Sequence, residues 1–424
     1  MNKKNLALQG RNNIELAEKN MGALMKLREN FARLKPFKGL KIAMALHITK
    51  ETAALVRTFI AGGANVAITS CNPLSTQDDV AEALKADGIA AYGYKGETGR
   101  EYYSFLNKVL DIKPNITIDD GCDLVTQIHL KRPTLLREII GGCEETTTGI
   151  IRLRAMERDR ALKYPIIAVN DNKTKHLMDN YYGTGQSTIN GIIRATNVLF
   201  AGKTVVIAGY GDCGKGCAMR AKGMGANVIV TEVDAFPALQ AQMDGFRVMP
   251  MKDAAPKGDI FITVTGNKHV IRVEHVHTMK NGAILANSGH FDIEIDVAGI
   301  KKAATQKKQI RPFMTRYTFG KRGSAHGKEV YVLADGRLVN LSAAEGHPSE
   351  VMSMSFCGQA LACEYLVQHN GVKGKNPLKP GVHYLPEEID QKIASLQLGV
   401  MGVKIDKLTP EQVRYLKEWK EGTN

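Results

Sequence analysis

The 424-residue sequence predicts an α/β protein with two Rossmann-like, doubly wound parallel sheets and a small C-terminal helical segment. Apolar runs and helix-compatible segments alternate along most of the chain, which is typical of parallel sheets covered by helices. A glycine-rich turn follows one apolar run near the middle of the chain. At ordinary domain sizes, this length predicts two or three domains, each with its own core.

The first half of the chain supplies the elements of one predicted sheet. Apolar side chains recur at helical spacing in residues 13–33, and residues 50–61 also fit a helix. Short apolar runs predict strands at 41–46, 65–69 and 115–118. Polar residues follow each of these runs, namely His47 and Thr49, residues 71–75 and residues 119–121. Because the carboxyl ends of parallel strands meet at one edge of a sheet, these residues predict a ligand crevice there.

A pattern of strand, glycine turn, helix and strand follows in the middle of the chain. The apolar run 204–208 leads into the glycine-rich residues 209–216, and a helix-compatible segment then leads to the apolar run 226–230. Further apolar runs predict strands of the same sheet at 259–265, 282–286 and 329–333. This arrangement is typical of a dinucleotide-binding unit, whereas a glycine motif without these neighbours is a weak signal.

The glycines and one acidic residue of this unit have distinct expected roles. Gly209 permits a tight turn, Gly211 lets the backbone approach a pyrophosphate, and Gly214 lets the helix pack against the strand. The helix N-terminus then offers N–H groups to the phosphates. Glu232 lies at the end of the following strand, where a carboxylate accepts from a ribose hydroxyl. Since a carboxylate repels a 2′-phosphate, Glu232 favours NAD over NADP.

Composition limits the class of protein. Hydrophobic residues make up 44% of the chain and charged residues 24%, as in ordinary globular proteins. No apolar run approaches the roughly 18 residues that span a bilayer, and the N-terminal sequence is too polar for a signal peptide. We therefore expect a cytoplasmic protein without a membrane partner.

The cysteines and histidines predict neither disulfides nor a metal centre. The seven cysteines are an odd number, and none forms a CxxC pair with metal-site spacing. Reduced thiols are the expectation for a cytosolic enzyme. His275 and His277 lack a third ligand in the local pattern, so we expect no bound metal.

The net charge of +14 raises the question of an anionic partner. The sharpest basic segment is residues 301–322, which contain lysines and arginines without an intervening acid. Phe313, Tyr317 and Phe319 lie among them, but no RNA-binding motif surrounds these aromatic residues. A solvated face or a subunit contact is therefore favoured over a nucleic-acid partner.

Polar residues between and after the predicted strands suit hydrogen bonds to a sugar and include one candidate pair for proton transfer. Residues 142–149 combine acids and hydroxyls with glycines, a composition that suits hydrogen bonds to a sugar. Lys175 and Asp179 lie four residues apart, which puts them on one face if the segment is helical. The pair is either a surface salt bridge or a proton-transfer pair beside a nicotinamide. His290 follows a predicted strand, and His347 lies between glycine and proline at a hinge-like crossover.

Short motifs occur in a definite order along nearly the whole chain. They are His47 with Thr49, CNPLSTQDD at 71–79, KGET at 95–98, DDG at 119–121, EETTTG at 144–149, NDNKTKHLMDN at 170–180, GYGDCGKG at 209–216, TEVD at 231–234, GHFDIEID at 289–296, GRLVNL at 336–341 and GHPSEVM at 346–352. This ordered set closely resembles S-adenosylhomocysteine hydrolases. A chance match of so many ordered blocks is not credible.

The resemblance implies a thioether hydrolase that uses NAD as a catalytic cofactor. Such enzymes oxidise the ribose 3′-hydroxyl of the substrate to a ketone, which acidifies the neighbouring C4′ proton. Homocysteine then leaves from C5′, water adds to the resulting enone, and the ketone is reduced again. The net reaction is the reversible hydrolysis of S-adenosyl-L-homocysteine to adenosine and L-homocysteine. The ketone serves as the electron sink that an alkyl thioether lacks.

The resemblance also implies which residues form the site. Catalytic roles fall to His47, Asp120, Lys175, Asp179, Asn180 and His290. Substrate contacts fall to Thr49, Glu51, Ser75, Glu145, Thr146, Lys175, Asp179, His290, Glu345, His347 and Met352. Cofactor contacts fall to Thr146, Thr147, Thr148, Asn180, Gly209, Gly211, Asp212, Gly214, Glu232, Asn267, Ser288, Gly289, His290 and Asn340.

Two pairs carry the implied proton transfers. Lys175 and Asp179 match the groups that bind the 3′-hydroxyl and assist its deprotonation. Asp120 and His47 match the acid–base pair that acts at C4′ and at the leaving thiol or incoming water. His347 matches a residue of the base-binding hinge.

The same resemblance predicts the domain organisation. Residues 1–182 and 342–384 form the substrate-binding domain, residues 183–341 form the NAD-binding Rossmann domain, and residues 385–424 form a C-terminal tail that serves oligomerisation. A homo-oligomer, specifically a tetramer, is implied. The sequence lacks the lysine- and tyrosine-containing ending that many relatives extend into a neighbour's cofactor site, so no residue is assigned to that contact.

Two acidic residues near the purine depart from the family pattern. Glu51 stands where the family commonly has glutamine, and Glu345 stands where methionine is common. A glutamine amide both accepts and donates hydrogen bonds, whereas an ionised carboxylate only accepts. Glu51 accepts either from the amino group of adenine or from N1–H of hypoxanthine, so S-inosyl-L-homocysteine is an alternative substrate. Thr184 also replaces a cysteine that is common in this region.

Two other classes of function stay open from the sequence. A net NAD-dependent dehydrogenase explains the glycine turn, but it accumulates NADH with its product, whereas the hydrolase recycles its cofactor. A nucleoside-binding regulatory protein retains the fold without turnover. The complete catalytic set argues against this second class.

Overall fold

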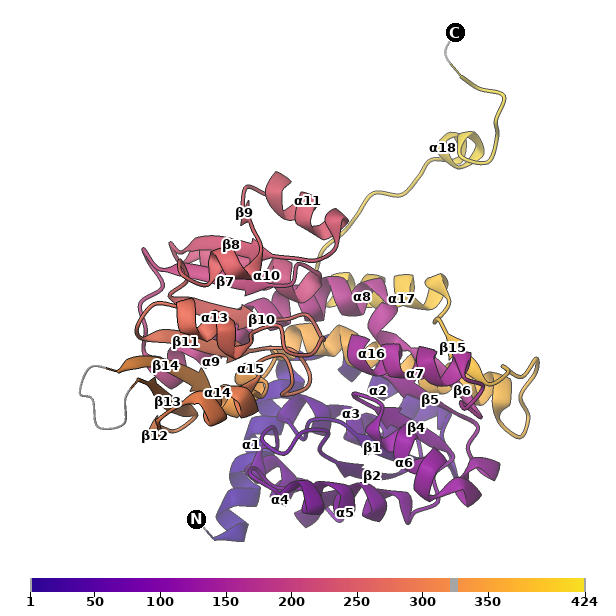
Figure 1. Ribbon diagram of the computed structural model, residues 1–424. Helices are drawn as coiled ribbons and strands as arrows, with labels where there is room; N and C mark the ends of the chain where they lie inside the picture. Colours follow the sequence, from indigo (N-terminus) through magenta and orange to yellow (C-terminus); the bar gives the residue numbers. More distant parts are fainter. Residues whose placement is uncertain (1, 321–326, 423–424) are drawn as a thin grey trace.

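Two separate sheets organise the computed structural model, which describes residues 2–320 and 327–422. The sheets occupy different halves of the molecule (Figure 1). Within the described residues, each sheet has a hydrophobic core on either face. The predicted α/β class with two doubly wound sheets is therefore confirmed.

The first sheet is entirely parallel. Its strands follow the spatial order β15 (Gly381–His383), β6 (Pro165–Ala168), β5 (Gly141–Glu144), β4 (Ile116–Asp119), β1 (Lys41–Ala45), β2 (Asn65–Thr69) and β3 (Ala90–Tyr92). One face packs against α1 (Lys3–Asn20), α2 (Gly22–Leu34), α3 (Lys50–Ala61), α4 (Asp78–Ala86), α16 (Ser349–Asn370) and α17 (Glu387–Val400). The other face packs against α5 (Gly99–Leu110), α6 (Asp123–Lys131) and α7 (Thr147–Arg158).

The second sheet is parallel except at one edge, where β12 and β13 are antiparallel to their neighbours. Its strands follow the order β12 (Gln306–Arg311), β13 (Met314–Phe319), β14 (Lys328–Leu333), β11 (Ala283–Asn287), β10 (Ile260–Thr263), β7 (Thr204–Ala208), β8 (Asn227–Thr231) and β9 (Arg247–Val248). One face packs against α9 (Thr184–Thr196), α10 (Asp212–Gly223), α11 (Ala235–Met243) and α15 (Val339–Ser342). The other packs against α12 (Met251–Ala254), α13 (Val273–Thr278) and α14 (Val297–Ala303).

The helix expected over residues 13–33 is in fact two helices, α1 and α2. Met21 separates them with φ −106° and ψ 46°, and its N–H donates to the carbonyl of Glu18. Gly22 lies against Val400, so that an added Cβ would come 2.5 Å from a methyl carbon of that side chain. The break lets α2 approach the end of α17 closely, which apolar periodicity alone does not reveal.

Several strands, including β5, lie outside the apolar runs that the sequence marks. The sequence of β5, GGCE, has weak strand propensity, yet the strand is buried between β4 and β6. A Cβ at Gly142 would overlap the side chain of Thr117 and would come 2.8 Å from Ile166. Glycine therefore leaves room for the neighbouring strands, and tertiary packing overrides local propensity.

Residues 385–424 do not form a single tail. Helix α17 contributes Ile393 to the core shared with α2 and α16. Its Asp390 carboxylate accepts from the N–H of Lys173 at 2.7 Å and of Thr174 at 3.3 Å. The first part of the segment therefore belongs to the body of the protein, because it supplies both apolar and capping side chains.

The C-terminal arm, residues 401–422, is a different structure. It runs away from both sheets in Figure 1 and carries the short helix α18 (Pro410–Tyr415). All of its residues are exposed, including the large apolar side chains of Leu416 and Trp419. Exposed apolar side chains in such number suit contact with another surface.

The described residues allow three further expectations to be compared with structure. None of their helices is long and apolar enough to cross a membrane. Strand β12, in the basic segment 301–322, is exposed at the edge of the second sheet, whereas Lys321 and Arg322 lie outside the described residues. The seven cysteines are free thiols.

Candidate active site

A cavity of about 1130 Å³ lies at the carboxyl ends of strands from both sheets. Strands β1 and β4 of the first sheet lead into His47 and Asp120, and both side chains line the cavity. Strands β7 and β11 of the second sheet lead into Gly209 and Ser288, which also line it. Open α/β sheets bind ligands at this edge. The cavity is therefore shared between the two halves of the chain.

Lys175 is at the centre of a buried polar cluster in the cavity wall. It ends α8 (Lys173–Lys175) and precedes the π-helix η3 (His176–Gly183), a rare element that is frequent at functional sites. Its ammonium lies 2.9 Å from Asp179 Oδ2 and 3.7 Å from Glu145 Oε1. It also donates to Asn180 Oδ1 at 2.7 Å. The Lys175 and Asp179 pair is thus buried, and a surface salt bridge is excluded.

Charges within this cluster oppose the effect of burial. Burial disfavours the ammonium of Lys175, but Asp179 and Glu145 outweigh it and raise the pKa of Lys175. Burial also disfavours the Asp179 carboxylate, but Lys175 and His347 hold the pKa of Asp179 below its usual value. Burial raises the pKa of Glu145 to about 7, with Lys175 acting in the opposite direction. Near neutral pH, Glu145 is therefore the member of the cluster poised to exchange a proton.

Side chains on and before α16 hold this cluster in place. Ser355 and Gln359 both donate to the carboxylate of Glu145. His347, which precedes α16, hydrogen-bonds to Asp179. Sequence reasoning missed Ser355 and Gln359, because they lie 210 and 214 residues from Glu145 and resemble ordinary polar positions in a buried helix.

His47 and Asp120 form a second polar pair in the wall. His47 Nε2 lies 3.3 Å from Asp120 Oδ2, and His47 Nδ1 lies 2.7 Å from Ser75 Oγ. Burial lowers the pKa of His47 to about 4, although Asp120 acts in the opposite direction. The imidazole is therefore neutral near pH 7 and able to accept a proton. Ser75 lies outside the cavity wall and supports His47 through this hydrogen bond, and its expected substrate contact stays a prediction.

Glu144 joins the loop after β4 to the loop after β5. Its buried carboxylate accepts from the N–H of Gly121 at 2.8 Å, Cys122 at 3.1 Å and Thr146 at 3.0 Å. A Cβ at Gly121 would overlap the ring of His290, so this histidine packs directly on the loop. These contacts fix the relative positions of the two loops that carry catalytic candidates.

The glycine turn of the second sheet has the geometry of a dinucleotide site. Gly209 has φ 105°, a conformation that favours glycine, and no other residue comes within 4 Å of a Cβ placed at Gly211. Helix α10 starts directly afterwards, at Asp212, so its N-terminus lies at the cavity. The Glu232 carboxylate accepts from the N–H of Tyr210 at 2.9 Å. These residues fit a dinucleotide whose ribose 2′-hydroxyl is free.

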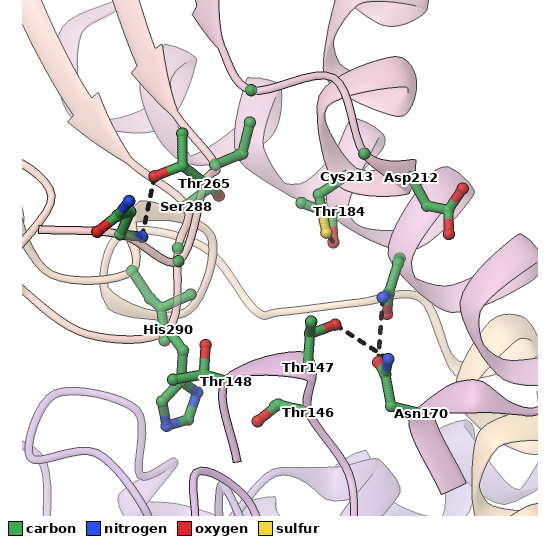
Figure 2. A pocket seen from close by; sticks show the side chains of 18 of the residues that line it. Thr146, Thr147, Thr148, Asn170, Thr184, Asp212, Cys213, Thr265, Ser288 and His290 are labelled. Atoms are coloured by element: carbon green, nitrogen blue, oxygen red, sulfur yellow. Dashed lines mark hydrogen bonds between the residues drawn. The ribbon is translucent and has the colours of Figure 1, made fainter. Parts of the chain in front are cut away.

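Figure 2 shows how the threonines before and at the start of α7 connect the two sides of the cavity. Thr146, Thr147 and Thr148 lie between His290 and Asn170 in this view. Asn170 donates to Thr147 Oγ1 at 2.9 Å and accepts from Asn180 Nδ2 at 3.1 Å. Asn170 was not predicted as a site residue, although its place in the 170–180 motif was a usable signal.

Glu51 and Glu345 take different positions. Glu51 is 2% exposed, lines the cavity and accepts from Ser349 Oγ at 2.6 Å. Glu345 is exposed and pairs with Lys50 at 2.8 Å and with Arg194 at 3.3 Å. It lines a smaller cavity of about 350 Å³ that also touches Glu51. Two cations therefore hold the Glu345 carboxylate outside the main cavity, and its purine contact stays a prediction.

Most of the predicted site residues line the main cavity. They are His47, Thr49, Glu51, Asp120, Glu145, Thr146, Thr147, Thr148, Lys175, Asp179, Asn180, Gly209, Gly211, Asp212, Glu232, Asn267, Ser288, Gly289, His290, Asn340, His347 and Met352. Besides Ser75 and Glu345, Gly214 lies outside this wall. A Cβ at Gly214 would overlap the carbonyl oxygen of Gly209, so glycine at this position lets α10 pack against the turn.

A dinucleotide fold that shares one cavity with two buried proton-transfer groups defines a nucleotide-dependent enzyme with acid–base chemistry. Residues 1–134 match the family model described as S-adenosyl-L-homocysteine hydrolase, and residues 180–346 match the model of its NAD-binding domain. The chain belongs to the S-adenosyl-L-homocysteine hydrolase family. It is accordingly a thioether hydrolase with NAD as its cofactor.

Curated relatives align over nearly the full length. The S-inosyl-L-homocysteine hydrolase of Methanocaldococcus jannaschii is 57% identical over 99% of this chain and 98% of that protein. The adenosylhomocysteinase of Saccharolobus solfataricus is 56% identical over 99% and 98%, and that of Archaeoglobus fulgidus is 55% identical over 98% and 100%. Overall similarity therefore does not separate adenosyl from inosyl substrates. Among solved structures, a dipicolinate synthase chain of Bacillus halodurans aligns with a TM-score of 0.48 and 12% identity, over 78% of this chain and 98% of that one.

Gly214→Ala is expected to lower both thermal stability and NAD retention. The added methyl group would overlap the carbonyl oxygen of Gly209, which cannot move without reshaping the glycine turn. Overpacking of this kind costs roughly 1–3 kcal/mol. The midpoint of thermal unfolding and the amount of NAD that copurifies with the protein measure the two effects.

Gly223→Ala is the matched control for this prediction. Gly223 ends the same helix, and no neighbouring residue comes within 4 Å of a Cβ placed there. The control variant should retain NAD and unfold at the wild-type temperature or above it. Equal behaviour of the two variants would contradict the packing role of Gly214.

Proposed function

We propose that this protein hydrolyses S-adenosyl-L-homocysteine reversibly to adenosine and L-homocysteine through transient oxidation of the ribose 3′-hydroxyl. The supporting observation is that the Lys175 cluster, the His47 and Asp120 pair and the glycine turn line one cavity. A simple dehydrogenase needs one proton-transfer group beside its cofactor. The second pair supplies what elimination and water addition require.

The residues of the cavity fit NAD. Bound NAD supplies a reversible two-electron acceptor for the 3′ carbon of the substrate. Gly211 and the N-terminus of α10 suit the pyrophosphate, and Glu232 suits the hydroxyls of a ribose. Thr147 and Thr148, which line the cavity, would hold the cofactor from the side of the first sheet.

Lys175 and Glu145 divide the deprotonation of the 3′-hydroxyl. The Lys175 ammonium binds the 3′-oxygen and stabilises negative charge as the O–H bond breaks. Glu145, whose pKa burial raises to about 7, takes up the proton and returns it when the ketone is reduced. Asp179, 2.9 Å from the ammonium, keeps Lys175 charged and oriented.

His47 carries out the steps at C4′ and C5′. Its neutral imidazole takes the C4′ proton as the bond from C5′ to sulfur breaks, and it then protonates the departing homocysteine sulfur. In the second half of the cycle, His47 takes a proton from water as the water oxygen adds to C5′, and it delivers that proton to C4′. Asp120, 3.3 Å from Nε2, orients the ring and stabilises its protonated form.

Parallel measurement of homocysteine and NADH tests this function. The purified protein is mixed with S-adenosyl-L-homocysteine, free homocysteine is measured with a thiol reagent, and NADH is measured by absorbance. Release of homocysteine without net NADH is the expected result. Stoichiometric NADH without homocysteine would instead identify a net dehydrogenase.

S-inosyl-L-homocysteine is the second candidate substrate, and Glu51 is the observation that favours it. Ser349 donates to Oε1 of Glu51, and the Lys50 ammonium lies 3.7 Å from the same oxygen. The other oxygen is left to accept a hydrogen bond from a base. Hypoxanthine offers N1–H at its pairing edge, whereas N1 of adenine has no hydrogen and only its amino group donates.

Glu51→Gln is expected to shift base preference toward adenine. The amide donates to N1 of adenine and accepts from its amino group, which a carboxylate cannot do. The ratio of kcat/KM for the adenosyl substrate to that for the inosyl substrate should rise roughly 5- to 150-fold, since one base-edge contact is worth about 1–3 kcal/mol. Initial rates with both substrates give this ratio.

Glu345→Gln is the matched control for base preference. This substitution also replaces a carboxylate by an amide, but at an exposed position outside the main cavity. The ratio of kcat/KM for the two substrates should stay at the wild-type value in this variant. An unchanged ratio for Glu51→Gln would mean that Glu51 does not read the base.

We propose the following setting for this activity. Residues 1–182 and 342–384 bind the nucleoside thioether, and residues 183–341 bind NAD. The C-terminal arm, residues 401–422, docks on a second copy through its exposed apolar side chains within a homotetramer. The enzyme acts in the cytoplasm, where free thiols such as its seven cysteines persist, and serves the S-adenosylmethionine cycle of one-carbon metabolism.

A further inference from the structure

Cys71 brings a third donor to the His47 and Asp120 pair. Its thiol lies 3.2 Å from His47 Nδ1 and 3.4 Å from Asp120 Oδ2, and His47 Nε2 lies 3.3 Å from the same carboxylate oxygen. One donor atom from each of the three residues falls within 4.8 Å of the other two. Cys71 is buried behind the pair, whereas His47 and Asp120 line the cavity.

The Asp120 carboxylate has unused bonding capacity at Oδ1, the oxygen that does not face Cys71 and His47. The side chain is 5% exposed, and its Oδ1 is buried without a hydrogen-bond partner among the described residues. The nearby His290 Nδ1 lies 3.5 Å away, which is too far for a good hydrogen bond. A buried carboxylate oxygen of this kind is unusual in proteins and is readily satisfied by a bound ligand.

The three donors match the coordination chemistry of a thiophilic divalent metal ion. Imidazole nitrogen, thiolate sulfur and carboxylate oxygen are all zinc ligands, with bond lengths of roughly 2.0–2.3 Å. Tetrahedral angles and such bonds put ligand atoms about 3.3–3.8 Å apart. Cys71 faces His47 Nδ1 at 3.2 Å, whereas Asp120 faces Nε2 at 3.3 Å, so the ring must turn for one nitrogen to share a metal ion with both residues. One donor atom from each residue already lies within 4.8 Å of the other two, which keeps this movement within the reach of side-chain rotation.

We propose that His47, Cys71 and Asp120 form a binding site for a thiophilic divalent cation such as Zn²⁺, with the fourth coordination position open to the cavity. The ion enters from the cavity and displaces the thiol proton of Cys71 to solvent. Occupancy inhibits the enzyme, because a coordinated His47 can neither accept the C4′ proton nor protonate sulfur. Only this inhibitory consequence depends on the proposed function, since metal binding itself needs no turnover.

Cobalt titration of the NAD-loaded protein tests the site without any assay of activity. Co²⁺ adopts similar sites to Zn²⁺ and gives visible bands in tetrahedral geometry, together with a near-ultraviolet charge-transfer band when a thiolate is bound. We expect one equivalent of Co²⁺ to produce both bands, and one equivalent of Zn²⁺ to abolish them. Absence of the charge-transfer band would overturn the proposal.

Cys71→Ser and Cys213→Ser are the paired variants. Cys213 also lines the cavity and is partly exposed, so it is the other thiol that a metal ion entering the cavity meets. Cys71→Ser should lose the charge-transfer band and weaken Zn²⁺ binding by at least about tenfold, whereas Cys213→Ser should keep both. Persistence of the band in Cys71→Ser, or its loss in Cys213→Ser, would overturn the assignment. Circular dichroism of each variant confirms that the fold is retained, and Cys71→Ala replaces Cys71→Ser if it is not.

Inhibition is then measured separately on the wild-type protein. Homocysteine release should fall as Zn²⁺ fills the site, with the same dissociation constant that the cobalt competition gives, and a chelator should restore it. Metal binding without inhibition would leave the coordination site standing and would contradict the role of His47 in the proposed function.

Discussion

Lys175→Ala is expected to lower kcat by about 10²–10³-fold, the range for loss of one group that stabilises developing negative charge. The substitution removes the ammonium that lies 2.9 Å from Asp179 and 3.7 Å from Glu145, so negative charge on the 3′-oxygen loses its counterion. Single-turnover absorbance of NADH measures this first step directly. Asp179 keeps its hydrogen bond with His347, so we expect the variant to fold and to retain NAD.

Lys173→Ala is the matched control on the same short helix. Lys173 is exposed and pairs with Glu387 at 2.7 Å on the surface, away from the cavity. Its removal should leave both 3′-oxidation and turnover unchanged, because surface ion pairs contribute little. Oxidation at the wild-type rate in Lys175→Ala would refute the assignment of Lys175.

The parts of the fold that the sequence predicted are those with local signals. Strands β7 and β8 lie within one residue of the predicted runs, since branched apolar residues and a glycine turn mark them. Strand β5 was missed because the glycine at position 142 is required by close contact with side chains of the two neighbouring strands, and local propensity does not reveal such contacts. The break at Met21 was missed for a similar reason, since α2 turns to meet a helix that is distant in sequence.

The same distinction between local signals and distant contacts applies to the residues of the site. Motifs marked the groups that carry chemistry, such as Lys175, because these residue types are uncommon in buried positions unless they are paired. Ser355 and Gln359 were not predicted, because their role in the site is to donate hydrogen bonds to a carboxylate more than 200 residues away in the sequence. The ion pairs of Glu345 with Lys50 and Arg194 were not predicted either, since the three residues come together only in the folded chain.

Burial acts on the two proton-transfer groups of the cavity with opposite outcomes. At His47 burial prevails over the single carboxylate of Asp120, which leaves a neutral base. At Lys175 two carboxylates, Asp179 and Glu145, prevail over burial, which leaves a cation. A neutral imidazole suits removal of a carbon-bound proton, and a cation suits stabilisation of an oxygen that gains negative charge. One cavity therefore holds the two charge states that oxidation and elimination separately require.

His47→Gln is expected to separate these two steps. Glutamine keeps a polar side chain beside Ser75 but exchanges no proton, so the C4′ proton is retained and the bond from C5′ to sulfur stays intact. Oxidation at the 3′ position depends on the Lys175 cluster instead. After mixing with S-adenosyl-L-homocysteine, NADH should therefore accumulate on the enzyme while homocysteine release falls by about 10²–10⁴-fold. Stopped-flow absorbance follows NADH, and a thiol reagent follows homocysteine.

His277→Gln makes the same replacement at an exposed position outside the cavity wall. This control should release homocysteine at the wild-type rate and show no accumulated NADH. The decisive comparison is between the two signals of His47→Gln. If NADH appearance slows as much as homocysteine release does, His47 takes part in oxidation. That result would contradict the assignment of oxidation to the Lys175 cluster and of elimination to His47. If only homocysteine release slows, the opposite charge states of the two groups account for the order of the steps.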